Sequence, residues 1–572
     1  MKTRIFKLLC VVAAGATQLL GACSGTVDSS GVPNSGGQGE GGGGGGGNST
    51  QGGGGSGNPT QIKPPDPPKP GGSERPDELS DFFIPPANRD RPLARLTKDQ
   101  LGAIAKDLFN VALSAQELAS LPIARSVDTT IDPTQYVNGV WSYAGVVATR
   151  AFVAPGSLTG YCAKKTLADL ACARALISEI GPLLLQRQPS TTEVDAFALH
   201  FTKADGLPSD ERLQTVLRAM LMAPGFLFPT EASATPPLRD HFRLSRLTLA
   251  IWNSLPDATT VTKLATDAAA GKPSAVDALL ADPRSERLYK RLGARLMDLS
   301  KLGDLTKAPA YNSVFSGTVQ TSLREELRLS LASTVSEGGA DTFTRFVTSP
   351  KLMVNKLNAP LYGLTSSGDN FETVNSLAAE ERSGILTSAP LLSILAHSDE
   401  GSVVKRGVFV LQRLLCVPPP PPPPNVPPLD SAGSSATASQ RERLDKHRQP
   451  ACEGCHKPID GVGFGLERYD AVGRFVSMDH GKPLTGKGVF PQTTDGPEKD
   501  FVGAKELGKL LAVSTQAREC FVSQLHAALT DRDSNAAESV ALDAARRKFV
   551  TTGDVHQLVS ELMTNATTNV RF

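Results

Sequence analysis

Apolar side chains recur at helical spacing along most of the chain beyond residue 94. The first such run contains Leu101, Ile104 and Leu108, three to four residues apart. It follows Thr97, which forms with Gln100 the capping-box pattern that begins a helix. The same periodicity predicts helices over 167–185, 213–222, 244–255, 275–280, 288–299, 323–335, 403–415, 504–511, 520–529 and 536–549. Because alternating apolar and polar stretches are scarce, the sequence predicts a mainly α-helical protein made of several small bundles in tandem.

The first 22 residues have the pattern of an export signal. A basic start precedes an apolar stretch over 8–20, which is too short to span a bilayer as a stable helix. The stretch ends in a Leu-Gly-Ala-Cys sequence that resembles the bacterial lipobox, so Cys23 is expected to carry lipid as the first mature residue. An ordinary secretory signal cut after residue 22 is the alternative. We expect a lipid-anchored protein of the cell envelope. An aspartate directly after the lipidated cysteine would resemble an inner-membrane retention signal, but residue 24 is serine, so the outer membrane is favoured.

Two segments contain too much glycine and proline to bury a core. Residues 23–88 are expected to form a disordered tether, flexible at first and stiffer where proline takes over. The unbroken proline run over 418–424 predicts a polyproline II rod, which we interpret as a spacer rather than as a ligand for an aromatic-lined groove. A formal net charge of +1 argues against nucleic acid as the main partner.

Six cysteines follow Cys23, and this even number suggests pairing. They are Cys162, Cys172, Cys416, Cys452, Cys455 and Cys520. If the two at 452 and 455 carry haem, the simplest arrangement outside the cytoplasm pairs Cys162 with Cys172 and Cys416 with Cys520. The alternative is four free buried thiols that act as small apolar residues.

One short motif indicates a specific chemistry. Residues 452–456 read Cys-Glu-Gly-Cys-His, a Cys-x-x-Cys-His pattern typical of covalent c-type haem attachment. Cys452 and Cys455 would each form a thioether to a haem vinyl group, and His456 would be the proximal ligand of the iron. A zinc site that adds Cys416 or Cys520 is the competing interpretation, but the adjacent Cys455 and His456 fit a tetrahedron poorly.

The distal ligand of the iron is left open by the sequence. Met478 and His480 follow the proximal histidine closely enough for either to fold back over the ring. A methionine would raise the potential, a second histidine would lower it, and an open position would permit catalysis. Arg474 is expected either to bond a haem propionate or to form a surface salt bridge. Three further histidines are held in reserve, although each more readily reads as an ordinary surface or core residue: His397, His447 and His526.

A glycine-rich segment after the motif has two interpretations. In the first, its backbone approaches the macrocycle closely and its apolar side chains cover the ring. In the second, it packs on its own protein. The glycines concerned are Gly461, Gly463, Gly465 and Gly473, and the apolar residues are Phe464, Leu466 and Tyr469.

Several of these segments together resemble a family of large exported bacterial proteins. That family is built from the domains of unknown function numbered 1587, 1595, 1592, 1588 and 1585. The resemblance rests on residues 95–109, 213–228, 243–257, 384–475 with the Cys-x-x-Cys-His motif, and 501–529. One departure is Asp460-Gly461, where the family often has Asp-Pro. The resemblance implies helical domains over 89–155, 156–235 and 236–368, a cytochrome c-like domain with the proline spacer over 369–480, and a C-terminal helical domain over 481–572.

The leading hypothesis is a cell-envelope lipoprotein with one covalent haem c. It would act in electron transfer or in a haem-dependent oxidation, with a redox partner or an envelope protein as its expected partner. The alternative, from another class, is a non-enzymatic envelope scaffold in which the motif is a relic or a structural metal site. The sequence contains no His-Glu-x-x-His pattern and no nucleophile elbow, so it offers no support for a hydrolase.

Overall fold

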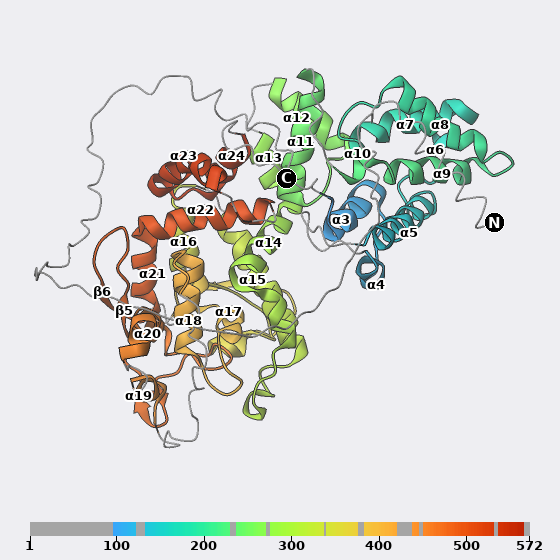
Figure 1. The fold of residues 1–572 in the computed structure, drawn as a ribbon. Coiled ribbons are helices and arrows are strands. Elements are labelled where there is room, and N and C mark those ends of the chain that lie inside the picture. Colours follow the sequence, from blue (N-terminus) through green and yellow to red (C-terminus); the bar gives the residue numbers. More distant parts are fainter. Residues whose placement is uncertain are drawn as a thin grey trace, which may run out of the picture. The chain divides into compact units, whose positions relative to one another are not determined.

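The structure is mainly helical, which confirms the fold class predicted from the periodicity (Figure 1). The computed structural model describes residues 95–121, 132–228, 236–269, 275–336, 339–375, 382–419, 438–445, 450–530, 533 and 536–564. The signal peptide, Cys23 and the tether expected over 23–88 lie outside these residues, as do His447 and most of the expected proline rod. Along the described ranges, no helix combines the length and the apolar character needed to cross a bilayer.

The first eight described helices share a hydrophobic core, to which Leu249 and Leu255 of the following segment also belong. These helices are α3 (Lys98–Phe109), α4 (Ala115–Ala119), α5 (Pro133–Ala151), α6 (Tyr161–Lys165), α7 (Asp169–Leu184), α8 (Thr191–Lys203), α9 (Ser209–Leu221) and α10 (Pro224–Leu227). The predicted capping box begins α3, because the Gln100 amide N–H donates to Thr97 Oγ1 while the Gln100 side chain accepts from the Thr97 amide. Ser114 and Ser190 begin α4 and α8 in the same way.

A second, larger core runs from α11 to the last described helix. Its first part contains α11 (Pro236–Trp252), α12 (Ala258–Ala269), α13 (Ala275–Ala281), α14 (Glu286–Met297), α15 (Gly317–Ser336), α16 (Thr342–Thr348) and α17 (Ala389–Ile394). Its second part contains α18 (Val403–Phe409), the π-helix η6 (Val410–Leu414), α20 (Pro450–Gly463), α21 (Gly503–Val513), α22 (Thr515–Thr530), α23 (Ala536–Thr552) and α24 (Val555–Thr564). Helix α19 (Gln440–Asp445) packs beside it, where Leu444 forms a small cluster with Val403 and Phe464. The sequence predicted one helix over 403–415, and the structure divides it into α18 and η6.

Aromatic side chains join distant segments in this larger core. The ring of Phe343 on α16 lies 5.4 Å from that of Phe521 on α22, and Phe521 stacks on Phe549 of α23 at 5.5 Å. Each of the three expected segments, 236–368, 369–480 and 481–572, contributes residues to the same hydrophobic cluster. These segments therefore share one core.

Three short antiparallel hairpins complete the fold. They pair β1 (Lys351–Val354) with β2 (Glu372–Asn375), β3 (Met478–Asp479) with β4 (Lys482–Pro483), and β5 (Lys487–Phe490) with β6 (Lys499–Val502). In the third hairpin Gly488 faces Phe501, and the Phe501 ring lies where a side chain at Gly488 would be. The backbone oxygen of Gly461 would lie 2.9 Å from the same Cβ position, so β5 also packs closely against α20.

A two-pronged ion pair links the two cores. Arg287 on α14 donates to both carboxylate oxygens of Asp107 on α3, at 2.6 and 2.8 Å. The same guanidinium donates to the backbone oxygen of Trp252 at 3.0 Å. Because the Asp107 side chain is only 8% exposed, this paired geometry is better protected from solvent than an ordinary surface salt bridge.

Candidate functional site

The Cys-x-x-Cys-His motif lies in the first two turns of α20. The backbones of Cys452, Cys455 and His456 are therefore helical. The side chains of the two cysteines are not among the parts that the structure describes. The structure shows the short helix α19 before the motif, separated from α20 by residues 446–449. The three motif residues therefore share one helix.

His456 has a carboxylate partner one helical turn further on. Its Nδ1 lies 3.4 Å from both oxygens of Asp460. Asp460 is buried, and the His456 side chain is 26% exposed. An imidazole held through Nδ1 in this way presents Nε2 as its metal-binding atom, which is the arrangement that metal-ligating histidines use. The residues present therefore fit a proximal haem ligand.

A cavity opens beside the motif. Its volume is about 550 Å³, within the range of sites that hold cofactors and other small molecules. On one side it is lined by Glu453, Gly454 and Lys457 of α20, and on another by Leu411 of η6 and by Leu415. The loop between β5 and β6 and Gln516 of α22 complete the lining. The first turns of α20 thus border a space large enough for a bound group.

The glycines of α20 serve helix packing. A Cβ atom at Gly463 would lie 2.2 Å from the backbone oxygen of Val403, and one at Gly407 would lie 2.0 Å from that of Ile459. Helices α18 and α20 are therefore packed backbone to backbone (Figure 1). Gly461 lies in α20, Gly463 is the last residue of that helix, and Gly465 lies in the 3-10 turn that follows. Gly473 lies in a turn at φ +84° against Ala389. The interpretation in which the segment packs on its own protein is correct.

The apolar residues after the motif are also used by the protein itself. Phe464, Leu466 and Tyr469 are at most 2% exposed. Leu466 and Tyr469 belong to the larger core, and Phe464 packs with Val403 and Leu444. The expectation that these three side chains cover the face of a macrocycle is therefore not met.

A buried arginine fixes the chain that leaves α20. Arg406 on α18 is fully buried and donates to the backbone oxygens of Leu466, Tyr469 and Asp470 at 2.7, 2.8 and 3.1 Å. Burial lowers the pKa of this guanidinium to about 10. The arginine is still charged at neutral pH, so three carbonyl dipoles stabilise one buried cation.

Arg474 forms an ion pair within its own loop. Its Nε lies 2.7 Å from Asp470 Oδ2, and its guanidinium lies 5.2 Å from the centre of the Tyr311 ring. Of the two expected roles, the structure contains the salt bridge. The side chain is 41% exposed.

Met478 and His480 lie at the β3–β4 hairpin. Met478 pairs with Pro483 and is half exposed, and His480 occupies the turn with φ +47°. The neighbouring Asp479 accepts the backbone N–H of Gln440 at the start of α19. Gln440 in turn accepts the N–H of Val403, the residue against which Gly463 packs at the end of α20. The structure thus connects this hairpin to the C-terminal end of α20, whereas the motif occupies the other end.

The reserve histidines have surroundings typical of structural residues. His526 on α22 is buried in the protein, at 1% exposure. His397 is exposed, and partial desolvation of its imidazole lowers its pKa. Its backbone oxygen accepts from Lys307 Nζ, and its N–H donates to the backbone oxygen of Glu400.

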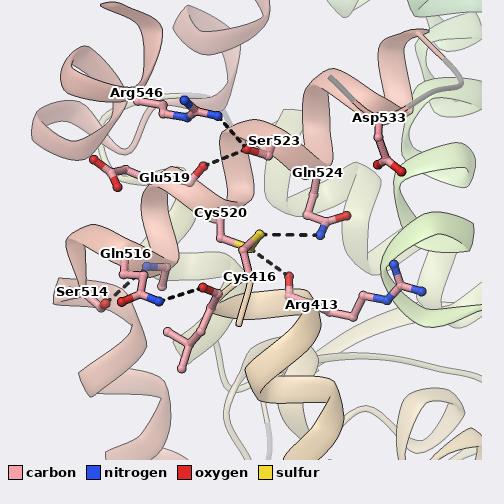
Figure 2. The surroundings of a disulfide bond; sticks show 12 residues. Arg413, Cys416, Ser514, Gln516, Glu519, Cys520, Ser523, Gln524, Asp533 and Arg546 are labelled. Carbon is pink, nitrogen blue, oxygen red and sulfur yellow. Dashed lines mark hydrogen bonds between the residues drawn. A yellow bond between two sulfur atoms is a disulfide. The ribbon is translucent and has the colours of Figure 1, made fainter. Parts of the chain in front are cut away.

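Both expected disulfides are present. Cys162 is joined to Cys172, and Cys416 is joined to Cys520 across 104 residues. Figure 2 shows the second bond between the end of η6 and α22, where Gln516 donates to the backbone oxygen of Leu415 at 3.0 Å. A disulfide sulfur is not a thiolate ligand, so Cys416 and Cys520 do not supply the fourth ligand of the competing zinc site.

Comparison with known families identifies two parts of the chain. Residues 238–364 match PSD4, described as a protein of unknown function (DUF1592), and residues 382–479 match PSCyt3, described as a protein of unknown function (DUF1588). Neither the curated proteins nor the solved structures gave a match. The chain therefore contains domains of a multi-domain family of unknown function, and the resemblance noted for these two parts of the sequence is confirmed.

Sequence reasoning missed two features of this region. The first is Asp460 as the partner of His456, although the spacing of four residues within a helix was a usable signal. The second is a group formed by Glu400, Asp479 and His480, whose ligand atoms all lie within 4.8 Å of one another. Because Glu400 is far from the other two in sequence, no local pattern reveals this group.

Proposed function

We propose that this protein is a cell-envelope lipoprotein that carries one haem c on α20 and acts in electron transfer or in a haem-dependent oxidation. The observation that carries the proposal is the Cys-x-x-Cys-His motif on one helix, with Nδ1 of His456 beside the carboxylate of Asp460. The cavity beside the same turns of α20 supports it further.

Each residue of the motif has a separate task. The thiols of Cys452 and Cys455 would add across the two vinyl groups, so that each S–H hydrogen goes to a vinyl carbon as the C–S bond forms. His456 would bind the iron through Nε2. Asp460 would hold the ring in orientation through Nδ1. Bound haem would supply one-electron exchange at the iron.

The export signal at the other end of the chain agrees with this chemistry. Covalent haem attachment takes place outside the cytoplasmic membrane, and the lipobox-like sequence before Cys23 would place the folded part there on a lipid anchor. A single haem cannot pass electrons far, so a redox partner is part of the proposal.

Expression of the full chain in a bacterium with periplasmic haem-ligation machinery tests the proposal. The purified protein should show a sharp reduced α-band and should retain haem in a denaturing gel. A Cys452→Ser/Cys455→Ser variant should lose the haem that the gel retains. The matched control is Cys162→Ser/Cys172→Ser, which removes another pair of cysteines and should keep it.

An unmodified chain without haem under these conditions would sink the proposal and favour the scaffold alternative. His456→Ala should keep the covalent bond but change the reduced spectrum, with His200→Ala as the control histidine. Single Met478→Ala and His480→Ala variants test the two distal candidates by the same spectrum. An unchanged spectrum in both would remove them from that role.

A further inference from the structure

Three metal-binding side chains converge beside the β3–β4 hairpin. They are Glu400, from the loop between α17 and α18, together with Asp479 and His480 of the hairpin. One ligand atom from each lies within 4.8 Å of the other two. We propose that these residues bind one divalent transition-metal ion, with Zn²⁺ as the physiological choice. This site lies outside the haem motif but shares His480 with the distal-ligand candidates, so its test uses a chain that carries no haem.

The spacing of the ligand atoms suits a shared ion better than a direct contact. Nε2 of His480 lies 3.8 Å from Oδ1 of Asp479. That separation is too long for a hydrogen bond. Two ligand atoms on one tetrahedral zinc ion lie about 3.4 Å apart, given metal–ligand distances of about 2.0 to 2.2 Å. A small movement of the exposed turn would therefore bring His480 and Asp479 onto one ion.

Each carboxylate already has one oxygen held by the protein. Oε2 of Glu400 accepts from Arg443 at 2.5 Å, and Oδ2 of Asp479 accepts from the backbone N–H of Gln440 at 2.6 Å. Arg443 is itself fixed, because it also donates to the backbone oxygen of Ala438. Oε1 of Glu400 and Oδ1 of Asp479 remain to face the ion. Metal sites commonly orient their ligands through outer hydrogen bonds of this kind.

The ligand set decides which class of ion fits. One imidazole with two carboxylates suits zinc and related transition metals, whereas calcium and magnesium sites use oxygen ligands. The side chains are 35%, 20% and 43% exposed for Glu400, Asp479 and His480, so the ion is reached from solvent. Water would complete the coordination. The ion would tie the loop before α18 to the hairpin after α20.

Zinc binding is measured on the full chain carrying Cys452→Ser and Cys455→Ser, so that thiolates of the motif contribute nothing. After chelator treatment, calorimetric titration with ZnCl₂ should give one ion per chain. Cobalt substitution should give visible bands of a site with nitrogen and oxygen ligands. His480→Ala and Glu400→Gln should each weaken zinc binding at least ten-fold, and Arg443→Met should weaken it less.

The matched control is Met478→Ala in the same background, because Met478 is an exposed neighbour on β3 that is not in the ligand group. It should bind zinc as tightly as the background protein. Circular dichroism verifies that each variant is folded. Absence of stoichiometric zinc in the background protein would overturn the proposal, and so would unchanged affinity in folded His480→Ala. If the unmodified chain acquires no haem in the expression test, the zinc affinity measured in this background does not change. The two proposals can therefore fail independently.

Discussion

Nδ1 of His456 lies 3.4 Å from a carboxylate oxygen of Asp460, which is one turn further along the same helix. Asp460 is buried, so its position is fixed by the packing of α20 on α18. The orientation of the imidazole is thus set by the same contacts that build the helix pair. Any chemistry of the motif depends on this second residue as well as on the cysteines.

Replacement of Asp460 by asparagine tests that dependence. The shape is kept, but the carboxylate charge beside Nδ1 of His456 is lost. A negative charge beside the proximal ligand favours ferric iron, so in the proposed haem-bound protein we expect this variant to keep its haem and to have a higher reduction potential. A ten-fold change in preference corresponds to about 59 mV for one electron. A redox titration measures the shift.

Asp543→Asn is the matched control for this experiment. Asp543 is also a helical carboxylate with a nearby partner, Arg546 at 2.8 Å, but it lies on α23. Its replacement should leave the potential where it was. An equal shift in both variants would mean that Asp460 acts only through the overall charge of the protein.

The two disulfides are expected to differ in their stabilising effect. Chain-entropy reasoning gives about 5 kcal/mol for the loop of 104 residues closed by Cys416 and Cys520, and about 3 kcal/mol for the loop of 10 residues closed by Cys162 and Cys172. Double serine variants of each pair should therefore lower the free energy of unfolding unequally. Urea titrations at equal protein concentration measure both. Equal losses would contradict the loop-length argument.

The sequence predicts much of the helical scaffold because its signals are local. Thr97 and Gln100 lie three residues apart, and the capping box they form is present. The helix over 403–415 was predicted as well, but its change to a π-helix at Val410 depends on packing that no periodicity encodes. Local patterns therefore fix which segments are helical and leave their irregularities open.

The candidate site can be predicted only in part from the sequence, because sequence signals are local. The motif residues are adjacent in the chain, so they were found at once. Gly463 was recognised as a place of close approach, but its partner is Val403, which a different helix supplies. Glu400 and His480 meet only because the hairpin folds beside the loop that precedes α18. Partners that are distant in sequence require the structure.

A buried carboxyl makes the stability of the larger core depend on pH. Glu326 on α15 is buried, accepts from Asn358 at 2.6 Å, and also bonds the hydroxyl of Tyr362. Burial raises the pKa of Glu326 from 4.5 to about 7. The folded state then binds more protons than the unfolded state between these two values. The contribution of Glu326 to the free energy of unfolding is therefore fully present below pH 4.5 and is lost as the pH rises through 7.

Glu326→Gln removes this titration. The unmodified protein should lose roughly 3 kcal/mol of unfolding free energy relative to the variant as pH rises from 4.5 to above 7. Urea titrations at several pH values, followed by the fluorescence of the buried Trp252 in a Trp141→Phe background, report this core. Parallel pH curves for the two proteins would show that Glu326 does not titrate in this range.

Arg406 and Arg474 both bind the loop that follows α20, but only the first is buried. Removing Arg406 leaves the backbone oxygens of Leu466, Tyr469 and Asp470 buried without their donor. Arg406→Met should therefore lower the unfolding free energy by about 3 kcal/mol or more. Arg474→Met removes a partly exposed ion pair and should cost less than about 1 kcal/mol. Trp252 fluorescence in urea measures both, and similar losses would show that the buried carbonyls find other donors.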